Sequence, residues 1–298
     1  MPILYVFATV WLWSLIPLAV KVAYQSFNFA FIGLTRLVVG SAVFLLFHLR
    51  APRSPGAAGA LPGPKWLGAR AWMVIAGLGI GGDQLLYTLG LRHTTASAAT
   101  LIVSTDGVIL ALLGVLVLGE RMSWMKMAAA TAALAGLVLV SWNGQDLSAL
   151  VRSEYFLGNV IVFSAGLCWA NYGLGQSVLA KTRGSSLVYI FLVGTAVGLV
   201  TAATQPPTHG PVTWQAVAAL AYLGLLGTGL AYVLLTQGMK RLEAATIGVV
   251  SCTLPLMTMV EARLLLHEQI TVYLLAGAAL VSAAVLLIVR HQRLYGQG

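Results

Sequence analysis

Long apolar runs separated by short polar steps cover this chain almost from end to end. A run of roughly 18 or more apolar residues predicts a membrane-spanning helix, because about 20 residues at 1.5 Å each cross a hydrocarbon core of ~30 Å. The pattern predicts ten such helices, over 3–22, 28–47, 71–91, 97–118, 124–142, 156–178, 187–203, 212–237, 245–266 and 272–289. The sequence therefore predicts an all-α integral membrane protein with a kink at Pro17 in its first helix.

The pattern repeats once along the chain. The stretch Gly90–Trp124 recurs at Gly238–Val272, an offset of 148, and Val6–Trp13 recurs at Val162–Trp169, an offset of 156. Each half then holds five helices, and an odd number makes the two copies enter the membrane in opposite senses. This is the pattern of an inverted-topology repeat, which is typical of many transporters.

The predicted organisation has four parts. A first five-helix repeat covers 1–143, with the Pro/Gly/Ala-rich stretch 50–70 as a flexible cytoplasmic connector; a loop covers 144–155, a second repeat 156–290, and a tail 291–298. Segment 3–22 lacks a basic leader and a small-residue cleavage site, so we interpret it as a retained span.

The loop charges predict the orientation, because Lys and Arg concentrate on the cytoplasmic side. With the N-terminus inside, the inner loops and tail hold Arg50, Arg53, Lys65, Arg70, Arg121, Lys126, Lys181, Arg183, Lys240, Arg241, Arg290 and Arg293. The outer loops hold only Lys21, Arg92, Arg152 and Arg263. Both termini are therefore expected in the cytoplasm.

Composition agrees with a membrane protein and argues against other classes. The chain is 59% hydrophobic and 8% charged, whereas a soluble domain has about 25% charged residues. A net charge of +9 does not indicate nucleic-acid binding here, because the positive residues sit in short loops. Cys168 and Cys252 fall inside predicted helices with no histidine cluster, and we expect neither a disulfide nor a metal site. No phosphate-binding loop or catalytic triad is present, so we predict neither an enzyme nor an ATP-driven pump.

Three features carry a family resemblance. The motif LGERMSW (118–124) has a Gly-Glu-Arg step between the fourth and fifth helices, TTASAATLI (94–102) begins the fourth helix with small residues, and Arg36 lies in the second helix. Together with the five-plus-five plan, these features resemble the EamA family of the drug/metabolite transporter superfamily. The resemblance implies a solute carrier of the bacterial inner membrane, often an exporter of amino acids or related metabolites, without a bound cofactor. The family usually has a proline midway along this fourth helix; the second half keeps Pro255, but the first half has Asp106 and Gly107.

Two acidic residues fall near the predicted middle of the membrane. An ionisable group there is costly and so indicates a functional site. Asp106 and Asp83 both lie about halfway along their helices, and Arg36 is expected within reach of either. The other repeat has Leu254 and Ala231 at the two acidic positions. Either Arg36 forms a purely structural pair with one acid, or an unpaired acid carries a proton or meets a cationic cargo group.

Aromatic and amide side chains complete the predicted site. They are Tyr87, one turn from Asp83, the repeat partners Trp13 and Trp169, and Asn171, Tyr172, Gln176 and Tyr232. Such a pocket suits an amphipathic solute, and an aromatic face beside a carboxylate suits an amine. The alternative is that these side chains only pack. Glu120 and Glu268 are expected to cap the helices that begin near 124 and 272, and Gly77, Gly81, Gly194 and Gly198 are expected at close helix contacts.

The sequence thus predicts a secondary transporter of small amphipathic metabolites, amino acids or related amines, that exports its cargo by alternating access. The alternative is a proton-coupled antiporter for cationic drugs or quaternary amines. A membrane enzyme or sensor would need a clustered catalytic set or a soluble appendage, and neither is present. The expected partners are a small solute, the lipid bilayer and, in the alternative, protons; nucleic acid is not expected, and the chain would act as a monomer or homodimer.

Overall fold

The computed structural model describes residues 2–50, 67–119, 121–144, 154–179, 186–239, 242, 247, 250–251 and 253–295. Its helices are α1 (Pro2–Ser14), α2 (Ile16–Ala23), α3 (Phe29–Arg50), α4 (Ala69–Gly90), α5 (Ala96–Val103), α6 (Asp106–Leu118), α7 (Trp124–Trp142), α9 (Glu154–Leu179), α10 (Ser186–Ala202), α11 (Trp214–Ala221), the π-helix η1 (Tyr222–Leu230), α12 (Ala231–Met239), α14 (Leu254–Leu265) and α15 (Val272–Tyr295). Within these residues there is no β-strand, only an isolated bridge between Phe27 and Thr208. The predicted all-helical class is confirmed.

Seven helical segments of the described residues are long and apolar enough to cross a membrane. They are Ile3–Ala23, Phe29–Phe47, Ala96–Leu118, Trp124–Trp142, Glu154–Leu179, Trp214–Gly238 and Val272–His291. The other three predicted spans overlap α4, α10 and α14. Helix α4 contains Asp83, Gln84 and several glycines, α10 has 17 residues, and α14 covers 12 residues of a predicted span that lies partly outside the described residues. The structure thus supports a multi-pass membrane protein, and ten spans stay a prediction.

The outside of the helix bundle is apolar. Leu116, Trp214, Val200 and Val272 are each at least 70% exposed. An exposed apolar surface of this extent is unfavourable in water, whereas a bilayer places hydrocarbon against it. These side chains therefore face lipid.

Three predicted helices are interrupted within the described residues: at Leu15, between α5 and α6, and at Thr253 before α14. The first is interrupted at Leu15, with Pro17 in the first turn of α2, which agrees with the predicted kink. The break between α5 and α6 was not predicted. There Ser104 Oγ donates to the Thr100 carbonyl at 2.7 Å and Thr105 Oγ1 donates to the Ile102 carbonyl at 2.7 Å. Side-chain bonds of this kind compete with the helical backbone pattern, so two adjacent hydroxyl residues account for the break.

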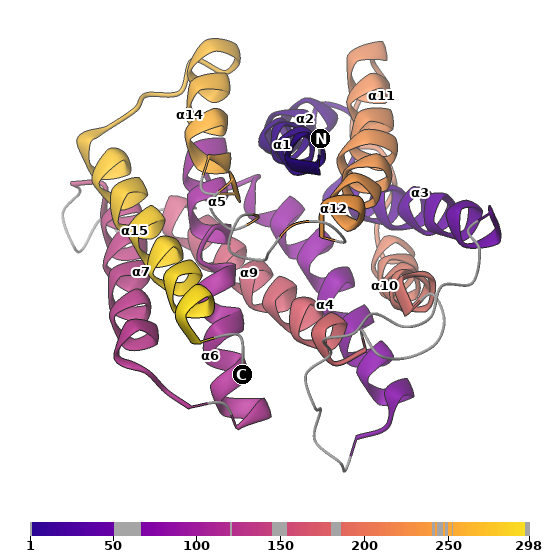
Figure 1. Ribbon diagram of the computed structural model, residues 1–298. Coiled ribbons are helices and arrows are strands. Elements are labelled where there is room, and N and C mark those ends of the chain that lie inside the picture. The colour runs from indigo at the N-terminus through magenta and orange to yellow at the C-terminus, as the bar shows by residue number, and fades with distance from the viewer. Residues whose placement is uncertain are drawn as a thin grey trace.

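Figure 1 shows α4 and α9 side by side through the centre of the bundle, with α7 and α15 on one side and α3 and α10 on the other. Glycines permit the close contacts. A Cβ added at Gly81 of α4 would lie 3.0 Å from the Gly194 Cα of α10, and one at Gly77 would lie 2.5 Å from the Val193 Cβ. Gly77, Gly81 and Gly194 thus lie at close helix contacts as predicted, and so does Gly198, whose added Cβ would meet Leu34 and Leu37 of α3.

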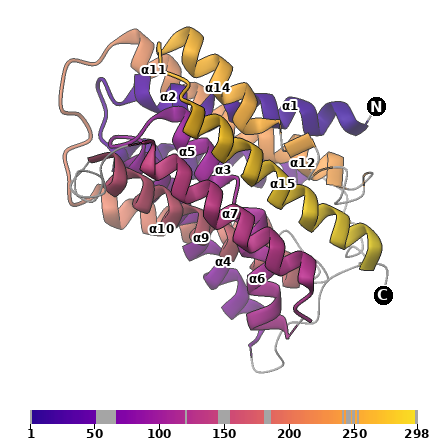
Figure 2. The same cartoon turned by 90° about the vertical axis from the view of Figure 1, so that its left-hand side faces the viewer.

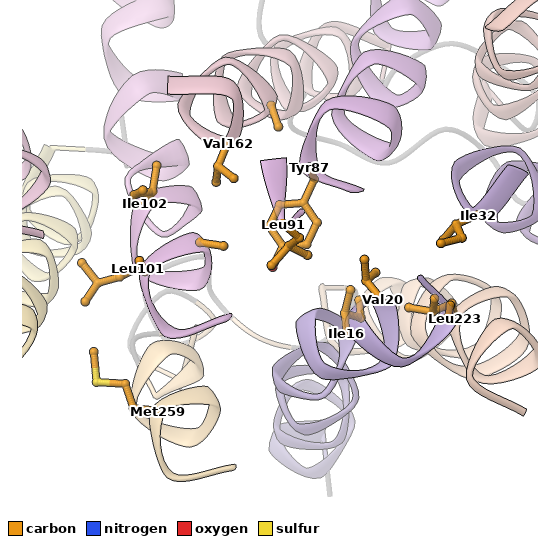
Figure 3. Close-up of a cluster of buried hydrophobic side chains, with 14 of the residues drawn as sticks. Ile16, Val20, Ile32, Tyr87, Leu91, Leu101, Ile102, Val162, Leu223 and Met259 are labelled. Carbon is orange, nitrogen blue, oxygen red and sulfur yellow. The ribbon is translucent and has the colours of Figure 1, made fainter. Parts of the chain in front are cut away.

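Both halves of the chain contribute to the main apolar core. Figure 3 shows Tyr87 and Leu91 of α4 lying between residues of α2, α5 and α9, with Met259 of α14 and Leu223 of η1 at the edges. The start of α1 and the end of α15 lie at the same end of the bundle in Figure 2. This arrangement is compatible with the predicted common side of the termini.

Candidate functional site

A cavity of about 1130 Å³ lies between the two halves of the chain. Helices α1, α3, α4 and α6 line it from the first half, and α9, α12, α14 and α15 line it from the second. Seven of the ten predicted site residues are on its wall: Asp106, Asp83, Arg36, Tyr87, Trp13, Trp169 and Tyr232. The cavity extends to exposed residues at the junction of α6 and α7, Arg121 and Trp124, and to His291 near the end of α15.

The helix break positions Asp106 in the cavity. Asp106 is the first residue of α6 and the acidic residue of its first turn. A carboxylate is favoured at this position because the N-terminus of a helix carries unsatisfied amides and a partial positive charge. The carboxyl group is also partly accessible from the cavity. Asp106 can therefore contact a solute from the first turn of α6.

Asp83, Gln84 and Arg36 form a second polar group deeper in the protein. Their exposed fractions are 7%, 3% and 4%. Gln84 Nε2 donates to Asp83 Oδ2 at 2.8 Å, and Arg36 Nε donates to Thr228 Oγ1 at 3.5 Å. Two buried atoms in this group have no hydrogen-bond partner, Arg36 Nη1 and Gln84 Oε1.

The first of the two alternatives, an ion pair of Arg36 with one of the acids, is not formed in this conformation. Among the described residues, no Arg36 nitrogen lies within 4.0 Å of a carboxylate oxygen. The charge of Asp83 nevertheless acts on Arg36 across a longer distance. Asp83, Asp106 and Arg36 therefore line one cavity without forming a salt bridge with one another.

The predicted aromatic residues divide into two sets. Trp13 Nε1 donates to the Gly227 carbonyl at 3.1 Å, and the Trp13 ring meets the Tyr232 ring edge-on at 5.5 Å on the cavity wall. Asn171, Tyr172 and Gln176 are not among the lining residues. Gln176 Nε2 donates to the Tyr172 hydroxyl at 3.0 Å, and Tyr172 packs edge-on against Phe191 and Tyr232. Tyr172 therefore faces neighbouring aromatic rings, and this geometry supports a packing role for it.

Sequence reasoning missed several polar lining residues, namely Gln84, Thr100, Ser104, Ser177, Ser251, Arg121, Lys126 and His291. Gln84 could have been found, because it adjoins Asp83 inside a predicted span and a buried amide there is as unusual as a buried acid. The others are hydroxyl residues or lie near helix ends, and the sequence offers no signal that separates them from ordinary positions.

The opposite end of the cavity is closed by polar contacts between the halves. The Glu268 carboxylate accepts from the backbone amides of Ala96 and Ser97 at 2.7 and 3.1 Å, and from Ser97 Oγ at 2.9 Å. Nearby, Lys21 Nζ donates to the Thr94 carbonyl and Ser14 Oγ donates to Glu261, both at 2.9 Å. The Glu268 bonds hold the start of α5 against the loop that follows α14, and the Ser14–Glu261 bond joins α1 to α14. The Lys21–Thr94 bond lies within the first half.

The predicted cap by Glu268 on the helix beginning at 272 is therefore wrong. Thr271 caps α15 instead, since its Oγ1 accepts from the Leu274 amide at 3.2 Å. Glu268 caps α5 of the other half, because the folded protein brings that helix end closer than the end of its own hairpin. Glu120, the residue expected to cap the helix at 124, lies outside the described residues, and Ser123 caps α7.

Fold and site together define a helical membrane transporter, and comparisons with known proteins name the family. The model of the EamA-like transporter family matches residues 1–142 and 156–290. The chain therefore belongs to the EamA-like transporter family.

Relatives extend over nearly the whole chain. An uncharacterized transporter of Archaeoglobus fulgidus is 30% identical over 90% of this chain and 93% of its own length. A probable terminal-alkyne amino-acid exporter of Streptantibioticus cattleyicolor is 28% identical over 95% of this chain and 91% of its own. A solved crystal structure superposes with a TM-score of 0.64 over 99% of this chain and 98% of that chain, at 21% identity, which supports the fold alone.

Proposed function

We propose that this chain is a secondary transporter that exports small amphipathic metabolites, amino acids or related amines, by alternating access. In this proposal ten helices form two inverted five-helix units, both termini are cytoplasmic, and the protein resides in the bacterial inner membrane. Helix breaks at Thr105 and Thr253, separated by the repeat offset of 148, support the duplication. The excess of Lys and Arg in the predicted inner loops supports the orientation.

One observation carries the proposal: a large cavity between the halves holds both signs of charge beside aromatic rings. Asp106 can attract an ammonium group and Arg36 an anionic group, while Trp13 and Tyr232 offer apolar surface. An amino acid has all three features. The name of the Streptantibioticus cattleyicolor relative agrees with cargo of this class.

The described conformation supports a transport cycle with two open states. The cavity reaches exposed residues near Arg121 and His291, on the predicted cytoplasmic side, and Glu268 joins the halves at the other side. Loading from the cytoplasm followed by opening of the Glu268 contacts would release cargo outside. This order of steps corresponds to export.

Reconstitution tests the proposal. Purified protein in liposomes loaded with unlabelled L-phenylalanine should take up radioactive L-phenylalanine by exchange, above liposomes without protein. A panel of aliphatic amino acids and their amines should compete for this exchange. If no amino acid or amine is exchanged or competes, the proposed cargo class is wrong.

A second candidate, a proton-coupled antiporter for cationic drugs or quaternary amines, is favoured by the two acids that form no salt bridge. Either Asp106 or Asp83 would then bind a proton and the cargo alternately. Under this candidate, Asp106→Asn abolishes uptake driven by a pH gradient in vesicles, and Asp83→Asn tests the other acid. Unchanged pH-driven uptake in both variants would remove the candidate.

A further inference from the structure

The guanidinium of Arg36 is the least satisfied charge that the structure describes in the cavity. The side chain is 96% buried, since its exposed fraction is 4%, and only Thr228 provides a hydrogen bond, a long one to Nε at 3.5 Å. Its Nη1 has no partner, although Arg36 lines the cavity. A buried cation without an anion is strongly unfavourable, so this nitrogen points to an anionic group of the cargo as its partner.

Asp83, which lines the same cavity, does not fill this position. Asp83 Oδ2 accepts from Gln84 Nε2 at 2.8 Å, and neither of its oxygens lies within 4.0 Å of Arg36. The oxygen of the same side-chain amide, Gln84 Oε1, is buried and accepts no hydrogen bond. Gln84 lines the same cavity as Arg36. An unmet donor and an unmet acceptor therefore belong to two side chains of the same cavity wall.

We infer that Arg36 and Gln84 form a subsite that binds a carboxylate together with an adjacent N–H group of the cargo. The planar guanidinium matches a carboxylate with parallel N–H···O bonds, and Gln84 Oε1 accepts from the neighbouring ammonium. This inference rests on the proposed function and restricts it. The cargo is a zwitterion, and the simple amines that Asp106 alone would accept are bound much more weakly.

Three probes with the same ring separate the contributions: L-phenylalanine, phenethylamine, which lacks the carboxylate, and 3-phenylpropionate, which lacks the amine. Affinities are measured by calorimetry on the purified full chain. A charge-assisted contact corresponds to a loss of about 10- to 100-fold, so the wild-type protein should bind L-phenylalanine by that factor more tightly than phenethylamine.

The variant Arg36→Gln should remove this preference. Its affinity for L-phenylalanine should fall to that for phenethylamine, whose own affinity should change by less than about threefold. Arg36→Lys should restore part of the preference, because lysine keeps the positive charge but lacks the planar guanidinium with its parallel N–H groups. Arg92→Gln, an exposed arginine away from the cavity, is the matched control and should bind all probes as wild type does.

The outcomes are distinct. Equal wild-type affinity for L-phenylalanine and phenethylamine would overturn the subsite, and so would an unchanged preference in Arg36→Gln; the first comparison needs no variant to fold. If none of the three probes binds, the proposed amino-acid cargo itself is wrong and the subsite falls with it. If the amine and the amino acid bind equally, the cargo class stands and only the carboxylate subsite is refuted.

Discussion

In each half of the chain one apolar helix is interrupted at a threonine: Thr105 between α5 and α6, and Thr253 directly before α14. Equivalent hydrogen bonds form at the two breaks. Each threonine hydroxyl donates to the carbonyl three residues earlier, Ile102 or Val250, at 2.7 Å in both cases. The backbone amides of the two threonines donate to the same carbonyls at 3.1 and 3.0 Å.

The residues that follow the breaks differ. Helix α6 begins with Asp106 and Gly107, whereas α14 begins with Leu254 and Pro255. All four residues line the cavity. In both halves the same kind of helix break thus places the N-terminus of a helix at the cavity, but only the first half has a charged residue there. The comparison indicates that the repeat determines the shape of the site and that one copy supplies its acid.

The largest effect is expected from Asp106→Leu, which places at the start of α6 the residue type that Leu254 provides at the start of α14. Losing a charge-assisted contact of ~2–3 kcal/mol should lower L-phenylalanine exchange in liposomes at least about 30-fold. Leu254→Met, a volume-conserving change at the equivalent position, is the control and should retain most activity. Exchange above half of wild type in Asp106→Leu would show that the asymmetry has no role in transport.

Helix packing provides a second comparison between the halves, at Gly81 and its repeat partner Gly229. A Cβ at Gly81 would meet the Gly194 Cα at 3.0 Å, whereas one at Gly229 would meet the Val43 Cγ2 at 2.9 Å. A side chain can rotate away but a backbone cannot, so Gly81→Ala should cost about 1–3 kcal/mol in the free energy of unfolding and Gly229→Ala less than half of that. Denaturation of the purified variants in detergent measures both, and the reverse order would contradict this explanation.

The closed end of the cavity should respond to Glu268→Gln, which removes the charge that caps α5. A carboxylate at a helix N-terminus contributes roughly 1 kcal/mol, so the open state on this side should become about fivefold more populated. The rate at which an impermeant reagent labels a cavity cysteine from this side measures the change. Glu154→Gln, at an exposed position in the first turn of α9, is the matched control. A rate unchanged in Glu268→Gln would show that these bonds do not keep the end closed.

The smallest effects are expected for Thr105→Val and Thr253→Val. Each loses one hydroxyl bond to a carbonyl, and such bonds contribute about 0.6 kcal/mol on average in membrane proteins. The two variants should therefore be destabilised by similar amounts in thermal unfolding. A difference above about 1 kcal/mol would mean that the two breaks are not equivalent.

Much of the fold follows from apolar periodicity, because a lipid environment requires long apolar helices with internally bonded backbones. The bounds predicted for 124–142 coincide with α7, and those for 71–91 and 187–203 differ from α4 and α10 by at most two residues. The break at Thr105 was not predictable in this way. Ser and Thr also occur in uninterrupted helices here, and hydropathy does not distinguish them.

The charged residues of the candidate site could be predicted from the sequence, because charged residues are rare inside membrane-spanning segments. Asp83, Asp106 and Arg36 were identified because charges inside predicted spans are rare, and all three line the cavity. Asn171 and Gln176 were included on polarity alone, although a helix face depends on packing that polarity does not reveal. The cap by Glu268 was assigned to the wrong helix for a similar reason, since a contact with Ala96 spans 172 positions of the chain.

The most direct test of a solute cavity between the halves is labelling at Gly107. A Cβ added there meets no atom within 4 Å, so Gly107→Cys, with Cys168 and Cys252 replaced by Ala, should fit without disturbing α6. In inside-out vesicles an impermeant maleimide should label this cysteine, and L-phenylalanine should slow the labelling. Absence of labelling from both faces of the membrane, in a variant that still folds, would contradict a water-accessible cavity at Asp106.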